Sequence, residues 1–208
     1  GGDTAAEVDT ATDDTATDDT ATDDTGPADA GQSGFCSIGE CAGWMPVSAL
    51  PAARTAHAAT KLPDGTVIIS GGADDSDVTT STAWRLDPGS NSWESAGALP
   101  SAMEGHVGLL LASGKILITG GMSWSPTAKA MLYDPATNAW SDTGPMNIGR
   151  AGHQLTLLGD GQVLVSGGSD GSPLHTPEVY DETTGAFTSG KDSGSAHATH
   201  VAVLLHDG

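Results

Sequence analysis

The residues of this chain best suited to chemistry are its histidines, because four of them recur at regular spacing. They are separated by 49, 47 and 47 residues, at His57, His106, His153 and His200. Imidazole nitrogen binds zinc and copper, so a set of equivalent histidines is a candidate metal site. Equivalent atoms of successive repeats lie too far apart to share one ion, however. We therefore interpret the four histidines as hydrogen-bonded structural residues.

A second candidate for metal chemistry is an acidic segment that follows the first repeat. Asp74, Asp75 and Asp77 carry carboxylate oxygens, the ligands that Ca²⁺ prefers. The segment lacks the turn glycine and the distal glutamate of an EF-hand loop. Solvated loop acids are the favoured interpretation and calcium the weaker one. No other cofactor is evident from the sequence.

Four residues are candidates for ligand binding. Trp124 has no equivalent in the other repeats and lies in a Ser/Pro segment, where it would stack on a sugar, anchor a protein partner or fold back on its own repeat. Arg54 and Arg150 each precede a repeated histidine by three residues and would meet an acidic ligand, although their recurrence favours structural hydrogen bonding. His175 is a solitary histidine, for which an ordinary surface position is the favoured interpretation.

The sequence contains none of the common catalytic motifs. It has no Gly-x-Ser-x-Gly elbow, no His-Glu-x-x-His helix and no glycine-rich phosphate loop. We therefore assign no catalytic residue and interpret the chain as a binding module rather than an enzyme.

The candidate residues are positioned by a repeat that predicts β-strands. Each copy runs from a histidine through an apolar strand, a turn with glycine and a β-branched strand to paired glycines, over residues 57–72, 106–121 and 153–168, and a partial copy begins at His200. A further strand ends in aspartate, and six residues later comes an aromatic, Trp93, Trp140 or Phe187, to which Trp44 is equivalent. The pattern predicts four antiparallel strands per module, with the repeated aromatics packed between modules.

The paired glycines, the apolar-Asp-Pro step and the trailing tryptophan resemble kelch repeats. More narrowly they resemble a bacterial form with a Pro-x-x-Arg-x-x-His lead, here Pro51, Arg54 and His57, a form also seen in galactose oxidase-like propellers. The resemblance covers Trp44 to Gly208. In the second copy the arginine is replaced by Met103, and in the fourth by His197.

The resemblance implies an all-β fold, a kelch-type β-propeller of four-stranded antiparallel blades. Three full blades and the start of a fourth are expected, with modules at about 44–93, 93–140 and 140–187 and a partial one at 187–208. Kelch propellers usually close with six or seven blades, so we expect the chain to be the front part of a longer protein. The propeller domain is assigned to residues 35–208.

Residues 1–34 are predicted to be a disordered linker. Residues 1–31 contain ten acids, no basic residue, no aromatic and three tandem TATDD copies, a composition that cannot bury enough surface to order itself. The two cysteines just beyond, Cys36 and Cys41, are expected to form a disulfide in an exported protein, in preference to free thiols.

The charge and the N-terminal composition indicate where the protein works. A net charge of −20 disfavours binding to nucleic acid or to anionic lipid. No apolar run is long enough to span a membrane, and no signal peptide is visible. The Gly-Gly start and acidic Thr-rich spacer resemble the region after the lipidated cysteine of a bacterial lipoprotein. We therefore expect an extracellular or cell-surface protein, whose only membrane contact would be an N-terminal lipid anchor.

The variable loops are the predicted recognition surface, because function usually lies where repeats differ. The loops between second and third strands, at 73–82, 122–130 and 169–177, are expected on one face together with the inter-blade loops. The predicted ligand of this face is a protein or a carbohydrate. The resemblance to galactose oxidase-like propellers implies one alternative, the propeller portion of a copper oxidoreductase. Its active-site residues would lie outside this chain, because Tyr133 and Tyr180 form no Tyr-His pair.

Overall fold

The computed structural model describes residues 47–204, and all regular elements in this range are β-strands. Several predictions concern residues outside the described ones: the linker domain, the Cys36–Cys41 disulfide and the position of Trp44. The domain boundary at residue 34 and the module ranges also stay predictions.

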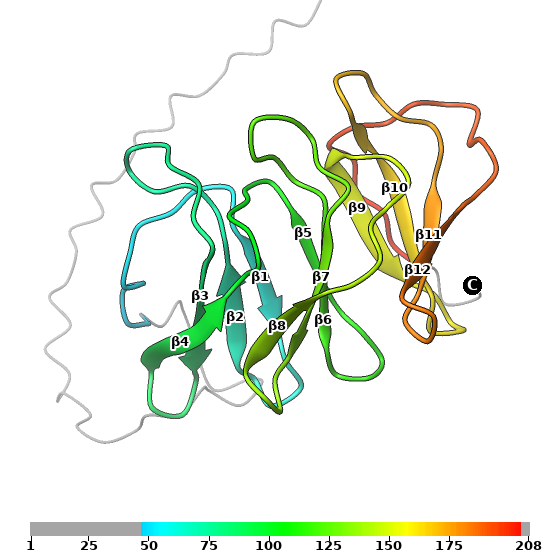
Figure 1. Ribbon diagram of the computed structural model, residues 1–208. Coiled ribbons are helices and arrows are strands. Elements are labelled where there is room, and N and C mark those ends of the chain that lie inside the picture. The colour runs from blue at the N-terminus through cyan, green and yellow to red at the C-terminus, as the bar shows by residue number, and fades with distance from the viewer. Residues whose placement is uncertain (1–46, 205–208) are drawn as a thin grey trace, which may run out of the picture. The chain divides into compact units, whose positions relative to one another are not determined.

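The twelve strands form three four-stranded antiparallel sheets, each arranged in chain order (Figure 1). The first sheet contains β1 (Ala58–Lys61), β2 (Val67–Ser70), β3 (Thr82–Asp87) and β4 (Ser92–Ala98). The second contains β5 (Val107–Leu110), β6 (Ile116–Thr119), β7 (Ala130–Asp134) and β8 (Ala139–Asp142). The third contains β9 (Ala151–Leu157), β10 (Val163–Ser169), β11 (Glu178–Asp181) and β12 (Ala186–Ser189). The predicted all-β blades of four antiparallel strands are confirmed.

The local sequence explains this meander. The β-branched runs form the second strand of each sheet, and in β6 all four residues are buried, as expected for a strand covered on both faces. The hairpins that lead into these strands contain Gly65, Gly114 and Gly161, with φ between +86° and +89°. Glycine adopts this conformation at little steric cost, so it fixes the turn and thereby the register of the two strands.

Neighbouring sheets pack face to face with their innermost strands side by side. β1 lies beside β5, and β5 beside β9 (Figure 1). One apolar cluster fills the space between the first and second sheets and includes Leu62, Ile68 and Met131. A second cluster fills the space between the second and third sheets and includes Leu117 and Val165. Each sheet therefore depends on its neighbours for burial.

The repeated aromatics lie at the outer ends of these interfaces. Trp140 stacks on Tyr133 with ring centroids 4.8 Å apart, and its indole N–H donates to the carbonyl of Ala96 in the preceding sheet at 2.8 Å. Trp93 makes the equivalent bond, at 2.8 Å, to the carbonyl of Ser48. These contacts agree with the predicted packing role.

Two sets of connections emerge at opposite ends of the sheets (Figure 1). The β1–β2, β5–β6 and β9–β10 hairpins lie at one end. At the other lie the β2–β3, β6–β7 and β10–β11 connections, together with the segments that join successive sheets, residues 99–106 and 143–150. We call this second end the loop face. It contains the segments predicted to form the recognition surface.

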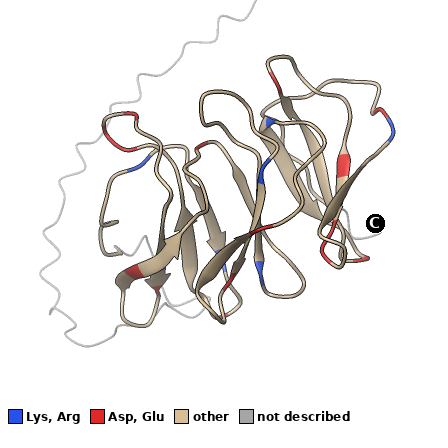
Figure 2. Cartoon of the chain, viewed as in Figure 1, with Lys and Arg blue, Asp and Glu red and all other residues tan. Residues whose placement is uncertain are grey.

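The second strands of the sheets, β2, β6 and β10, contain no Asp, Glu, Lys or Arg, and the described charged residues lie on other strands, turns and connections (Figure 2). The sheet faces are therefore free to pack against one another. Within residues 47–204, no helix is long and apolar enough to cross a membrane.

Candidate functional site

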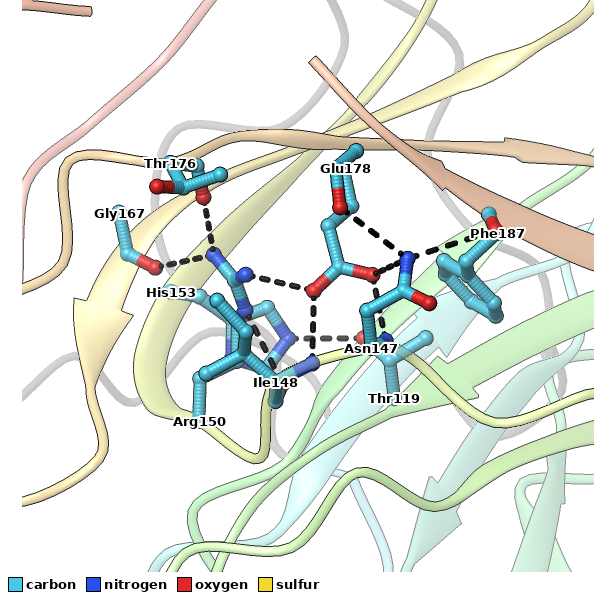
Figure 3. Close-up of polar contacts among 10 residues, drawn as sticks. Thr119, Asn147, Ile148, Arg150, His153, Gly167, Thr176, Glu178 and Phe187 are labelled. Atoms are coloured by element: carbon cyan, nitrogen blue, oxygen red, sulfur yellow. Dashed lines mark hydrogen bonds and ion pairs between the residues drawn. The ribbon is translucent and has the colours of Figure 1, made fainter. Parts of the chain in front are cut away.

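The repeated histidines join successive sheets. His106 directly precedes β5, His153 lies within β9 and His200 follows the third sheet; each bonds a hydroxyl of the second strand of the preceding sheet. The Nε2–O distances are 3.1 Å from His106 to Ser70, 2.7 Å from His153 to Thr119 and 2.8 Å from His200 to Ser166. Figure 3 shows the pair formed by His153 and Thr119. We call these three contacts the histidine latches.

The paired glycines let the latches form. A Cβ atom on Gly120 would lie 2.3 Å from the carbonyl oxygen of Arg150 and 2.5 Å from Cε1 of His153. The next amide, that of Gly121, donates to the same Arg150 carbonyl at 2.9 Å. Only a residue without a side chain permits this approach of two backbones.

Burial keeps the central latch histidines neutral. Desolvation lowers the pKa of His106 to about 4, although a hydrogen bond with Ser70 opposes the change. Desolvation, with the nearby charge of Arg150, lowers the pKa of His153 to about 3. Both rings are therefore uncharged at neutral pH, and each leaves its Nδ1 buried without a hydrogen-bond partner among the described residues.

Arg150 forms a fully buried ion pair with Glu178 (Figure 3). Its Nη2 donates to Glu178 Oε1 at 2.7 Å, and its Nη1 donates to the carbonyls of Gly167 at 2.9 Å and Thr176 at 3.2 Å. Both side chains have 0% exposure. The guanidinium thus has no surface at which to meet a ligand, and its position matches the structural interpretation of the recurring arginines.

The carboxylate of Glu178 is held by the connection that precedes β9. It accepts from the backbone N–H of Asn147 at 2.6 Å, from the Asn147 side-chain amide at 3.0 Å and from the backbone N–H of Ile148 at 3.1 Å. Sequence analysis missed Glu178 and Asn147. A comparison of modules gives the signal, because the second sheet has Met103 at the position of Arg150 and Met131 at that of Glu178.

Arg54 occupies the equivalent place in the first sheet but has no carboxylate partner among the described residues. Its Nη1 donates to the carbonyls of Gly71 at 3.0 Å and Thr82 at 3.1 Å. Trp84 stands at the position of Glu178. Arg54 is partly exposed. That it meets an acidic ligand stays a prediction.

Trp124 protrudes from the β6–β7 connection on the loop face. Its side chain is 102% exposed, and Met122 beside it is also exposed. The alternative in which this side chain folds back on its own sheet is therefore wrong. The backbone φ of Trp124 is +149°, a value that non-glycine residues rarely adopt.

The other predicted site residues lie on two connections: Asp74, Asp75 and Asp77 between β2 and β3, and His175 between β10 and β11. Asp74 uses Oδ1 to accept from the backbone N–H groups of Ser76 at 2.8 Å and Val78 at 3.0 Å, which closes its own loop. Among residues 47–204, no three His, Cys, Asp or Glu side chains, Asp75 and Asp77 included, come together as a metal site. His175, on the β10–β11 connection, pairs with Asp192 at 2.9 Å on the exposed surface.

Comparisons with known proteins agree with this architecture. Residues 106–147 match the family model of the Kelch motif. The solved structure of YjhT, a kelch-type propeller, is similar with a TM-score of 0.67 and 19% sequence identity, over 81% of this chain and 61% of YjhT. This chain thus spans about three fifths of the length of YjhT, and at this identity the likeness concerns the fold. No curated protein matches the chain.

Proposed function

Because this chain is built of kelch-type β-propeller blades, we propose that it is a non-catalytic binding module that holds a protein partner on its loop face. Trp124 is the central contact in this proposal. The observation that carries it is the full exposure of this indole, while the repeated aromatics Trp140 and Phe187 pack within the blades.

The position of Trp124 costs free energy in the unbound protein. A non-glycine residue in a sparsely populated backbone region costs about 1–3 kcal/mol, and the exposed ring gains nothing from burial. Tryptophan is enriched among the residues that dominate binding energy at interfaces. A pocket on a protein covers a protruding ring on all sides, whereas a sugar stacks on one face. This difference favours a protein partner over the glycan, which is the second candidate.

Replacing Trp124 with glycine separates a binding role from a structural one. We expect Trp124→Gly to raise the free energy of unfolding by about 1 kcal/mol, because glycine adopts positive φ without strain. The same substitution is expected to weaken partner binding by about thirtyfold or more, the effect of losing an interface hot spot. Urea denaturation measures the first effect. The control is Val78→Ala, which removes another exposed apolar side chain of the loop face.

The partner is identified by photo-crosslinking in the full-length protein in its own cells. A benzophenone amino acid replaces Trp124, or Ala112 in the β5–β6 hairpin at the opposite end. A protein captured at 124 but not at 112 is purified, and its affinity for wild type and Trp124→Gly is compared. Equal affinity for both, or a loss of stability in Trp124→Gly, would contradict the proposal. Binding only to a polysaccharide, lost in Trp124→Gly, would favour the glycan candidate.

We also propose that the module acts outside the cell or at its surface, which the acidic Thr-rich N-terminal sequence supports. Protease added to intact cells is expected to digest the protein, and full protection would contradict this location. The copper oxidoreductase alternative depends on residues beyond 47–204, because no three potential metal ligands come together within that range.

A further inference from the structure

A pocket of about 250 Å³ opens on the loop face beside the second sheet. Three segments line it: the connection before β5, the start of β7 with the residue before it, and the end of β8 with the residues that follow. They contribute Pro100 and Ser101, Lys129 and Ala130, and Asp142, Thr143 and Pro145 respectively. No predicted site residue lines this pocket. It therefore adds a feature to the loop face that the sequence did not indicate.

The pocket contains polar groups without partners. Ser101 Oγ is buried and makes no hydrogen bond to any described residue. Within the described part of the chain, neither Lys129 nor Asp142 takes part in an ion pair. The Ser101 oxygen has almost no exposed surface, so the charged side chains that an occupant of the pocket can reach are those of Lys129 and Asp142, both exposed. The polar groups thus favour a polar occupant.

The third sheet shows which group fits the equivalent place. Asn147 corresponds to Pro100, because each precedes its repeated histidine by six residues, and Ser189 corresponds to Asp142, two residues after the repeated aromatic. The side-chain nitrogen of Asn147 donates to Glu178 Oε2 at 3.0 Å, to Ser189 Oγ at 3.3 Å and to the carbonyl of Phe187 at 3.4 Å. Figure 3 shows the amide among Glu178 and Phe187. The third sheet therefore fills this place with its own carboxamide.

In the second sheet the equivalent place lacks that carboxamide. Proline at position 100 has no amide side chain, while Asp142 supplies a stronger acceptor than the serine of the third sheet. Lys129 supplies a donor. A ligand with one charge meets a like charge here, since Lys129 repels a cation and Asp142 repels an anion. A neutral carboxamide matches both residues, with its NH₂ toward Asp142 and its oxygen toward Lys129.

We infer that this pocket binds a primary carboxamide, supplied by an asparagine or glutamine side chain of the partner protein. That the carboxamide belongs to a partner protein rests on the proposed function. The chemistry of the pocket rests only on the residues that line it and on the equivalent contacts of Asn147.

The test titrates the full-length protein with N-acetyl-asparagine methylamide and follows amide chemical shifts by NMR. The aspartate and leucine analogues are controls, because they share the backbone amides of the probe but lack the side-chain carboxamide. We expect the asparagine probe to bind with a millimolar dissociation constant and Asp142→Ala to weaken it by about tenfold, the effect of one charge-assisted hydrogen bond. Equal binding of the three probes, equal binding to wild type and Asp142→Ala, or no shift with the asparagine probe would overturn the inference.

A second variant copies the third sheet into the second. Pro100→Asn with Asp142→Ser places a carboxamide of the chain itself in the pocket, and we expect it to abolish probe binding while the circular dichroism spectrum stays unchanged. Undiminished probe binding in this folded variant would contradict the inference. Trp124→Gly is expected to leave probe binding unchanged. Loss of partner binding in that variant therefore reports on the proposed function, and probe binding reports on the pocket.

Discussion

Arg150→Met is expected to lower the free energy of unfolding by about 3–5 kcal/mol, because it leaves a buried carboxylate without its cation. Glu178 has 0% exposure, so water cannot replace the guanidinium. The substitution also removes donors from the carbonyls of Gly167 and Thr176. Urea denaturation of the full-length protein at neutral pH measures the loss.

The double variant Arg150→Met/Glu178→Met is expected to recover most of this stability. The second sheet already has methionine at both positions, and Met103 and Met131 are buried in the cluster between the first and second sheets. Buried ion pairs replaced by apolar residues of similar volume are often neutral in stability. A residual deficit of about 1–3 kcal/mol is expected, since the N–H groups of Asn147 and Ile148 lose their acceptor.

A double-mutant cycle with Arg150→Met, Glu178→Met and the double variant isolates the coupling between the two residues. The interpretation requires the double variant to be more stable than either single variant. If the double variant is as unstable as Arg150→Met, the two positions are not an exchangeable pair, and the match with Met103 and Met131 has no energetic meaning.

Acidification is expected to begin to destabilise the protein at a pH above the range in which carboxylates titrate. The pKa of His106 falls from 6.5 to about 4 on folding, and that of His153 falls to about 3. In the unfolded chain both rings bind protons near pH 6.5, so the contribution of the two neutral rings to the free energy of unfolding is fully present above this pH. It is lost as the pH falls from 6.5 toward 4 for His106 and toward 3 for His153. The shift of His106 corresponds to about 3 kcal/mol.

The titratable and charged groups around the latches also lower the pKa values of the two histidines, as burial does. His57 lowers the pKa of His106, and Arg150, His106 and His200 lower that of His153. Urea denaturation at pH 7.5, 6.5, 5.5 and 4.5 measures the loss, within a range in which most carboxylates stay ionised. His106→Gln keeps a side-chain amide near Ser70, but glutamine does not titrate. The variant is therefore expected to reduce the dependence of the free energy of unfolding on pH. A constant free energy of unfolding from pH 7.5 to 4.5 would show that folding does not lower the pKa values of His106 and His153.

The strands were predictable from sequence because their signals are local. Alternation of apolar residues, a glycine at the hairpin and an aromatic at fixed spacing each act within a few residues, and three copies reinforce them. The hairpin glycines at positive φ and the packing of Trp140 follow from this pattern. The same reasoning placed the variable loops on one face.

The buried pair and the pocket were not predictable, because each joins residues far apart in the chain. Arg150 and Glu178 are 28 residues apart, and the anion occurs in only one of the three sheets. The pocket brings together Pro100, on the connection before β5, and Asp142, at the end of β8, and it depends on how these residues differ from Asn147 and Ser189. The exposure of Trp124 depends on a backbone conformation that no neighbouring residue specifies.

The histidine latches have a consequence for how such a chain lengthens by gene duplication. Each histidine is encoded one module downstream of the hydroxyl that it binds. In a copied segment of one full period, the histidine therefore binds the hydroxyl of the preceding module, and the hydroxyl is bound by the histidine of the following module. Insertion or deletion of a whole period preserves every latch, whereas duplication of a segment that contains only the hydroxyl or only the histidine leaves that copy without a partner. Selection for stability alone would then keep the period near its present 47 to 49 residues.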